Sequence, residues 1–157
     1  MTSPDFETPL GPYWLHTDAV SILALSTQPT PDSADPALRQ QVAEWLDAYF
    51  KGSFPALDAL PLAPRGTPFQ RRVWEALREI PPGRIESYGA LAKRIDAAPR
   101  PVGAALGANP LPILLPCHRV VASDGALRGY SGRGGLESKR FLLRLEGVEV
   151  TRRARPV

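Results

Sequence analysis

The sequence is poor in the side chains that build metal sites and disulfides. Its 157 residues include one cysteine, Cys117, and two histidines. A single thiol cannot form an intrachain disulfide, and one cysteine with two histidines lacks a fourth zinc ligand. The sequence therefore excludes a disulfide framework and predicts no metal site. Cys117 is either a buried structural residue, as free cysteines commonly are, or a nucleophile.

Long apolar runs and a leader-like segment are also missing from the sequence. No stretch approaches the roughly 20 apolar residues of a membrane span, and residues 1–11 are polar and acidic with no apolar core of a secretion signal. Together with the single thiol, which has no second cysteine for a disulfide, these features predict a cytoplasmic protein with no membrane partner. The net charge of +3 is a mild indication of a polyanionic partner.

The chain divides near residue 60. Residues 13–26 carry β-formers on both sides of a turn-like Thr17-Asp18, which predicts a short hairpin. Asp35 followed by Pro36 is typical of a helix start, and apolar residues at helical spacing continue to Tyr49. We therefore expect residues 1–60 to form an N-terminal α/β structural domain with a linker.

The remainder is mostly helical. Thr67-Pro68 repeats the helix-start signal, and Ser87 can cap a short helix that runs to about residue 95. A second short helix over residues 100–108 follows after a tight connection, a pattern that resembles a helix-turn-helix. A final helix is predicted over residues 136–146, with Gly147 in the position after its cap.

The predicted fold class is therefore α+β: a small N-terminal strand-and-helix domain, then a mainly helical C-terminal domain with a helix-turn-helix and the reactive cysteine. We place the C-terminal domain at residues 61–150 and a basic tail at residues 151–157.

Several motifs between residues 61 and 148 resemble, in order, those of the O6-alkylguanine-DNA alkyltransferases. The motif around the cysteine, Pro116 to Val121, is the most specific of them. The others are Gly66-Thr67-Pro68-Phe69-Gln70, Val73-Trp74, Ile80-Pro81-Pro82-Gly83, Ser87-Tyr88, Val102-Gly103, Asn109-Pro110, Gly129-Tyr130-Ser131-Gly132, Lys139, Leu142-Leu143 and Glu146-Gly147.

The resemblance implies that residues 61–150 form a DNA-binding and alkyltransferase domain that carries out a single-turnover DNA repair reaction. The protein would bind double-stranded DNA that contains an alkylated guanine, rotate the base out of the stack and transfer the alkyl group to its own cysteine. O6-alkylguanine is the expected substrate, with O4-alkylthymine as a further possibility. Displacement at an alkyl carbon needs a soft nucleophile but no cofactor, so none is expected. We expect the protein to act as a monomer.

The resemblance also implies roles for individual residues in catalysis. Cys117 would be the nucleophile, and His118 would remove the thiol proton through a water molecule. Glu146 would hold the histidine in its useful tautomer, as the third member of a catalytic triad does. Asn109, at the end of the second short helix, would brace the active-site turn.

Further residues would recognise the substrate. Tyr88 would donate to the guanine and crowd the phosphate backbone, and the Val120 carbonyl would accept from the guanine amino group. Tyr130 and Ser131 would form the lip of the base pocket.

Contacts to DNA are expected from the two short helices. Arg100 would fill the space that the flipped base leaves, and the small residues Gly103 and Ala104 would let the helix approach a groove closely. Phosphate contacts would come from the helix start at Ser87 and from basic Lys93 and Arg94.

The sequence departs from the family pattern in two places. The segment between Tyr88 and Arg100 is about two residues shorter than usual, which predicts a tighter turn between the two helices. Pro101 replaces the usual small residue there, and proline is tolerated near a helix start. The loop around Arg133 is about two residues longer, which bears on the range of alkyl groups accepted.

Two other functions remain open at this point. A non-catalytic lesion-binding protein would resemble the alkyltransferase-like proteins, which lack the cysteine at this position. A cysteine hydrolase would use Cys117 and His118 on an acyl substrate, but no convincing oxyanion hole is evident in the sequence.

Overall fold

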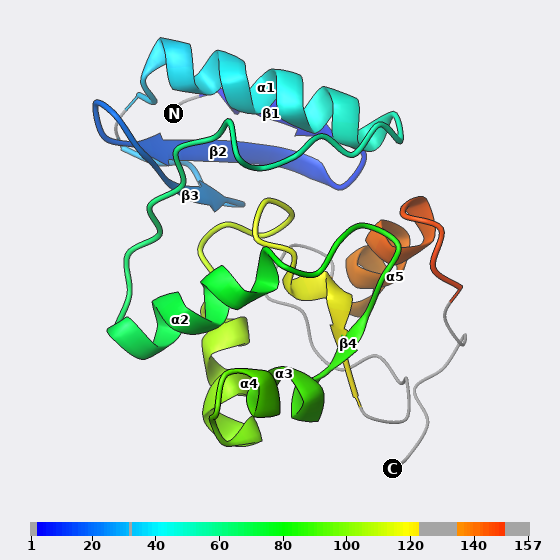
Figure 1. Cartoon of the computed structure of the whole chain (residues 1–157). Helices are drawn as coiled ribbons and strands as arrows, with labels where there is room; N and C mark the ends of the chain where they lie inside the picture. The colour runs from blue at the N-terminus through cyan, green and yellow to red at the C-terminus, as the bar shows by residue number, and fades with distance from the viewer. Residues whose placement is uncertain (1–2, 32, 123–134, 150–157) are drawn as a thin grey trace. The chain divides into compact units, whose positions relative to one another are not determined.

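The structure is a computed structural model that describes residues 3–31, 33–122 and 135–149 (Figure 1). The chain forms two compact units, Met1–Arg65 and Gly66–Val157. The first contains a small antiparallel sheet with one helix, and the second is mainly helical. The α+β fold class predicted from the sequence is confirmed. Within the described residues, no helix has both the length and the apolar character needed to span a bilayer.

The sheet of the first unit has the strand order β1-β2-β3. Strands β2 (Gly11–Thr17) and β3 (Ile22–Ser26) pair antiparallel and form the predicted hairpin, with an irregularity between His16 and Thr17. The third strand, β1 (Phe6–Thr8), was not predicted. It has three residues, too few for an alternating apolar pattern to be recognised in the sequence.

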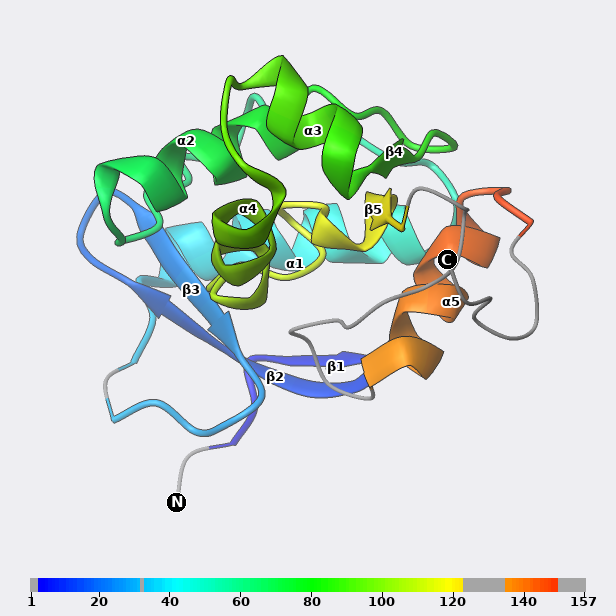
Figure 2. The same cartoon turned by 90° about the horizontal axis from the view of Figure 1, so that it is seen from below.

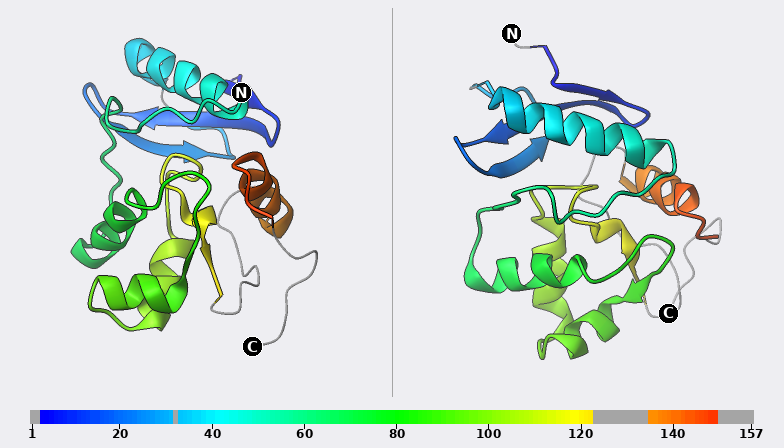
Figure 3. Two further views of the ribbon diagram at one scale, coloured as in Figure 1. Left: turned by 45° about the vertical axis from the view of Figure 1, so that its right-hand side comes forward. Right: turned by 45° about the horizontal axis from the view of Figure 1, so that its top comes forward.

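One helix, α1 (Pro36–Phe50), lies along one face of this sheet (Figures 1 and 3). The Asp35 side chain accepts a hydrogen bond from the Leu38 N–H at 3.0 Å, so the predicted cap is confirmed. The apolar residues at helical spacing are buried along one stripe of the helix, namely Leu38, Val42, Trp45, Leu46 and Tyr49.

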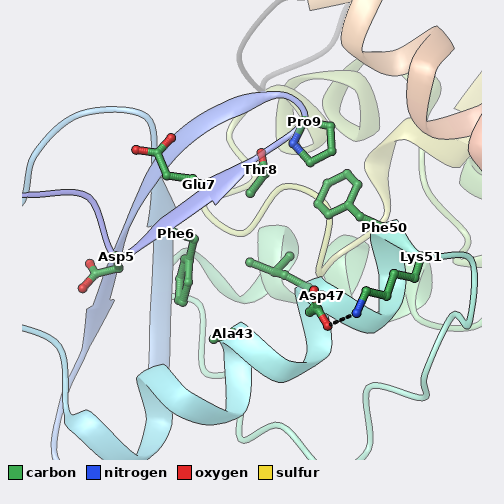
Figure 4. Close-up of a pocket in the computed structure, with 10 residues that line it drawn as sticks. Asp5, Phe6, Glu7, Thr8, Pro9, Ala43, Asp47, Phe50 and Lys51 are labelled. Carbon is green, nitrogen blue, oxygen red and sulfur yellow. Dashed lines mark ion pairs between the residues drawn. The ribbon is translucent and has the colours of Figure 1, made fainter.

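A pocket of about 430 Å³ lies in the first unit between β1 and the second half of α1 (Figure 4). Phe6 points from the strand toward Ala43 of the helix, and an ion pair of 3.0 Å joins Asp47 to Lys51 at the rim. None of the residues that line this pocket belongs to the site predicted from the sequence.

Helix α2 (Pro68–Leu77) of the second unit begins with a complete capping box. The Thr67 hydroxyl accepts from the Gln70 N–H, and the Gln70 side chain accepts from the Thr67 N–H. The buried Trp74 indole N–H donates to the Ala105 carbonyl at 2.8 Å, which ties α2 to a later helix.

That later helix, α4 (Pro99–Gly107), forms the predicted helix-turn-helix with α3 (Tyr88–Arg94) (Figure 2). It begins at Pro99, one residue earlier than expected. Ala98 is extended, as residues before proline prefer, so Pro99 takes the first helical position. The short connection requires a positive φ of 56° at Asp96, a conformation that Asp tolerates better than most residues.

Two short strands and a final helix complete the second unit. Strand β4 (Glu86–Ser87) pairs in parallel with β5 (Val120–Val121), a two-residue ladder that the sequence did not predict. Helix α5 (Gly135–Leu145) occupies the predicted region.

Helix α5 ends in a Schellman motif. Gly147 has a φ of 86°, its N–H donates to the Arg144 carbonyl, and the Val148 N–H donates to the Leu143 carbonyl. This turn fixes the position of Glu146, the residue that caps the helix.

Candidate active site

Cys117 directly follows a turn whose backbone conformation is constrained. The Leu115 N–H donates to the Leu111 carbonyl at 2.8 Å, and between them Ile113 has a φ of 75°, which is unusual for a β-branched residue. Pro116 follows with φ −79° and ψ 66°, the geometry of an inverse γ-turn, and the Cys117 N–H donates back to the Leu115 carbonyl at 2.7 Å. The sulfur is therefore carried by a backbone with little freedom.

The Asn109 side chain holds this turn from inside. Its amide N–H donates to the Leu115 carbonyl and its Oδ1 accepts from the Leu111 N–H, both at 2.9 Å. The residue is buried. These contacts satisfy two backbone groups that the irregular turn would otherwise leave without partners.

His118 and Glu146 meet although they lie 28 residues apart in sequence. Cys117, His118 and Arg119 form a short 3₁₀ helix, and His118 Nε2 lies 2.7 Å from Glu146 Oε2. Both side chains are fully buried. The carboxylate is therefore a partner of the histidine and not a solvent-exposed group at the end of a helix.

Arg119 is a member of the site that sequence reasoning did not assign. Its guanidinium donates to both oxygens of Glu146, at 2.8 and 2.9 Å, and to the Ile80 carbonyl at 2.6 Å. The signal was an arginine within residues 111–122, a segment that is apolar apart from His118 and Arg119, since a buried charge requires a partner. The sequence could not say which carboxylate that partner is.

These contacts govern the ionisation of the pair. Burial acts to raise the pKa of Glu146, but hydrogen bonds and charges from His118 and Arg119 outweigh it and hold this pKa at about 2. Burial lowers the pKa of His118, against the hydrogen bond and charge of Glu146, while the charges of Arg119 and Lys139 lower it further. At neutral pH the pair is therefore a carboxylate and a neutral imidazole.

The tautomer of His118 follows from this ionisation. A carboxylate can only accept hydrogen bonds, so Nε2 carries the imidazole proton and donates it to Glu146. The other nitrogen, Nδ1, is buried and makes no hydrogen bond to any described residue. In this tautomer Nδ1 is a proton acceptor.

Lys139 is a second charged residue that was given no role from the sequence. It is buried, and its ammonium lies 5.8 Å from the centre of the Tyr88 ring. Burial lowers the pKa of Lys139 to about 8, against the charge of Cys117. The signal was its place on the apolar face of α5, three and four residues before Leu142 and Leu143.

The residues predicted to recognise the base are described in part. Tyr88 begins α3 and is half-buried, and Val120 lies in β5 opposite Glu86 of β4. Tyr130 and Ser131 lie outside the described residues.

The residues predicted to contact DNA divide into two groups. Arg100 and Ala104 are exposed and Gly103 is partly exposed, on the face of α4 opposite the buried Val102 and Ala105. A Cβ atom added at Gly103 would meet nothing within 4 Å. These residues therefore share an open helix face, on which Gly103 and Ala104 are small.

The second group lies on and beside α3. The Ser87 hydroxyl accepts from the Ala90 N–H at 3.0 Å and so caps the helix, and Lys93 is exposed. Arg94 differs from the expectation of a phosphate contact. Its guanidinium donates to Glu79, to both oxygens of Glu86 and to the Ala76 carbonyl. We assign Arg94 to the stability of the fold, because these intramolecular partners occupy its donors.

Within the described residues, no group of three or more histidine, cysteine, aspartate and glutamate side chains is arranged to hold a metal ion. The ionisable groups around Cys117 are suited to acid–base chemistry at a thiol.

Comparisons with known proteins agree with this chemistry. A family profile described as the DNA-binding domain of 6-O-methylguanine DNA methyltransferase matches residues 68–148. The methylated-DNA–protein-cysteine methyltransferase of Haemophilus influenzae is 38% identical over 153 residues, which cover 91% of this chain and 84% of the relative. The DNA base-flipping protein of Thermus thermophilus is 43% identical over 144 residues, which cover 90% of this chain and 97% of the relative.

A solved structure is similar over both units. The crystal structure of Mycobacterium tuberculosis OGT in complex with DNA matches with a TM-score of 0.81 at 40% identity, and the match covers 90% of each chain. These findings confirm the resemblance seen in the sequence and extend it into the first unit.

Proposed function

The chain belongs to the family of methylated-DNA–protein-cysteine methyltransferases, and we propose that Cys117 is the residue that accepts the alkyl group of O6-alkylguanine. The protein is a DNA repair protein that binds DNA, flips the target base and transfers its alkyl group to a cysteine of its own. The observation that carries the assignment is the position of its single cysteine, next to a buried histidine and carboxylate.

Transfer begins with removal of the thiol proton. Neutral His118 takes this proton at Nδ1 through a water molecule, while Glu146 accepts from Nε2 and stabilises the imidazolium that forms. The charge of Lys139 stabilises the Cys117 thiolate. The thiolate then attacks the alkyl carbon, so that the Sγ–C bond forms as the C–O6 bond breaks.

The departing guanine leaves with a proton restored. Tyr88 donates toward the base, and the proton held by His118 is the source that returns it to neutral guanine. The Val120 carbonyl accepts from the guanine amino group and so favours guanine over other bases. The thioether on Cys117 is stable, so each protein molecule reacts once.

The exposed face of α4 contacts the duplex. Gly103 and Ala104 allow the helix to lie close to the minor groove, and Arg100 fills the space that the flipped base leaves. Lys93 and the start of α3 at Ser87 contact phosphates. We further propose that the protein acts as a monomer in the cytoplasm and prefers duplexes with an alkylated guanine.

A lesion-binding function without chemistry is the second candidate, because one relative is named a DNA base-flipping protein. Alkyl transfer requires the Cys117 sulfur, whereas lesion binding does not. Its rigid turn and the neutral histidine beside it favour transfer.

The Cys117→Ser variant tests the assignment. We expect it to bind a duplex with O6-methylguanine within about threefold of the wild type and to transfer no methyl group, since the hydroxyl is a far weaker nucleophile. An unmodified duplex of the same sequence is the control for binding. Loss of both folding and damage preference would show that the cysteine is structural, and retained transfer would show that another residue accepts the group.

A further inference from the structure

The contacts of Arg119 exceed what a helix end or a turn requires. Its guanidinium forms a two-pronged ion pair with Glu146 and also donates to the Ile80 carbonyl, and the side chain is almost fully buried. Burying an ion pair has a large desolvation cost that hydrophobic residues of similar volume would avoid. The position therefore calls for an explanation beyond stability.

The charges around His118 explain why an arginine is buried at this position. Three ionisable groups act on the imidazole: Lys139 of α5, Glu146 at the end of that helix, and Arg119 of the 3₁₀ helix. Glu146 alone would favour the imidazolium, because an opposite charge at hydrogen-bonding distance stabilises the charged form. A histidine that is already protonated cannot accept the thiol proton.

Arg119 opposes that effect through the same carboxylate. Its Nη2 donates to Oε2, the oxygen that also contacts His118 Nε2, and its Nε donates to Oε1. The carboxylate keeps its geometry and its role as acceptor, but its charge is largely balanced by the guanidinium. The positive charge of Lys139 also lowers the pKa of His118.

We propose that Arg119 is a positioning residue for the transfer reaction: it holds Glu146 as an ionised, oriented acceptor and keeps His118 neutral at physiological pH, so that Nδ1 can accept the Cys117 proton. The inference rests on the proposed function, because it names what maintains the base of that site. It predicts that the charge of Arg119 acts on the pH dependence of transfer.

A purely structural role is the alternative. Arg119 joins the 3₁₀ helix to the end of α5 and to the turn at Ile80, so its loss could loosen the site as a whole. That role predicts a loss of rate by the same factor at every pH. A charge effect predicts a loss that is large in acid and recovers in base, because the histidine then loses its proton again.

Titration of the histidines by nuclear magnetic resonance, without DNA, tests the proposal directly. The chain has two histidines, so His16 of the first unit serves as an internal reference for His118. In the wild type we expect His118 to remain neutral at pH values below the ordinary pKa of about 6.5. A wild-type His118 that titrates at or above that value would overturn the proposal, and this measurement needs no variant.

The Arg119→Met variant adds the kinetic test. We expect the pKa of His118 to rise by about 1 to 3. Transfer should fall more than about tenfold below the wild type near pH 6 and approach it near pH 9. The Arg119→Lys variant keeps the charge but not the two-pronged contact with Glu146, so its rate should fall by the same factor at every pH, with no additional loss in acid.

Arg94→Met is the matched control, since Arg94 also binds carboxylates and a backbone carbonyl but does not contact His118. The Arg94→Met variant should lower the stability of the protein, and its transfer rate should show no additional loss at acidic pH.

If Arg119→Met does not fold, Arg119→Gln removes the charge and keeps a hydrogen-bond donor. A loss of rate that is uniform with pH, with an unchanged His118 titration, would overturn the proposal. Absence of transfer by the wild type would instead contradict the proposed function, which the titration does not depend on.

Discussion

The charged side chains around Cys117 depend on one another because all of them are buried. His118, Arg119, Lys139 and Glu146 each have less than a tenth of their surface exposed. In such surroundings the loss of one charge changes the proton affinity of the others, since water is not there to screen it. Substitutions in this group should therefore change pH profiles as well as rates.

Lys139 provides the clearest case. Replacing it with methionine keeps most of the volume and removes the ammonium beside Cys117. We expect about tenfold slower reaction of the thiol with both iodoacetamide and free O6-benzylguanine near pH 7, because less of it is ionised. Lys51→Met in the first unit is the control. Equal rates for Lys139→Met and the wild type with both reagents would remove Lys139 from the reaction.

The same substitution has a predicted effect on stability. The folded-state pKa of Lys139, about 8, lies below its ordinary value of 10.5, so the unfolded chain binds more protons between these pH values. The contribution of Lys139 to the free energy of unfolding therefore rises as pH increases from about 8 to about 10.5. Urea denaturation of the wild type and Lys139→Met should show that this part of the rise is absent from the variant.

At the residue scale, the sequence indicated Cys117 and His118 but not the charges that control them. The pairing of His118 with Glu146 came from the family resemblance, since no local pattern links residues 28 positions apart. Arg119 and Lys139 were visible only as charges in apolar surroundings. Which buried carboxylate or thiol each one meets depends on tertiary packing, and periodicity does not contain that information.

The elements themselves were predicted more completely. The caps at Asp35, Thr67 and Ser87 place three helix starts, because a side-chain acceptor next to a free N–H is a local interaction. The strands β1, β4 and β5 were missed, since two or three residues carry no period. The γ-turn at Pro116 was likewise not predicted, although it fixes the sulfur.

Arg100 of helix α4 is expected to act in base flipping. Arg100→Ala should reduce transfer from duplex DNA by more than about tenfold and leave transfer from free O6-benzylguanine within about twofold, because only the duplex requires a base to be flipped. Single-turnover rates on the two substrates measure the difference. Arg39→Ala in the first unit is the control, and equal losses on both substrates would exclude a role of Arg100 in flipping.

Charge is distributed unevenly over the whole molecule. Residues 1–65 contain three basic and eight acidic side chains, whereas residues 66–157 contain 16 basic and eight acidic ones. The modest net charge of +3 thus conceals a unit of −5 and a unit of +8. Affinity for a polyanion should come from the second unit, where α3 and α4 lie.

Salt dependence tests this distribution. The logarithm of the DNA affinity of Cys117→Ser should fall linearly with the logarithm of salt concentration, with a slope of about −2 to −4 for a few phosphate contacts. Lys93→Gln should make the slope shallower by about 1. Lys51→Gln changes the charge equally in the first unit and should leave the slope unchanged; an equal effect of both would contradict a DNA-binding face on α3 and α4.

The central claim is that Cys117 accepts an alkyl group from DNA once and permanently. The most direct measurement is mass spectrometry of the intact protein and its peptides after mixing with excess duplex that carries one O6-methylguanine. We predict the gain of a single methyl group located on Cys117, with unmodified guanine restored in the DNA. No gain in mass while the lesion persists, or a methyl group on another residue, would contradict the claim.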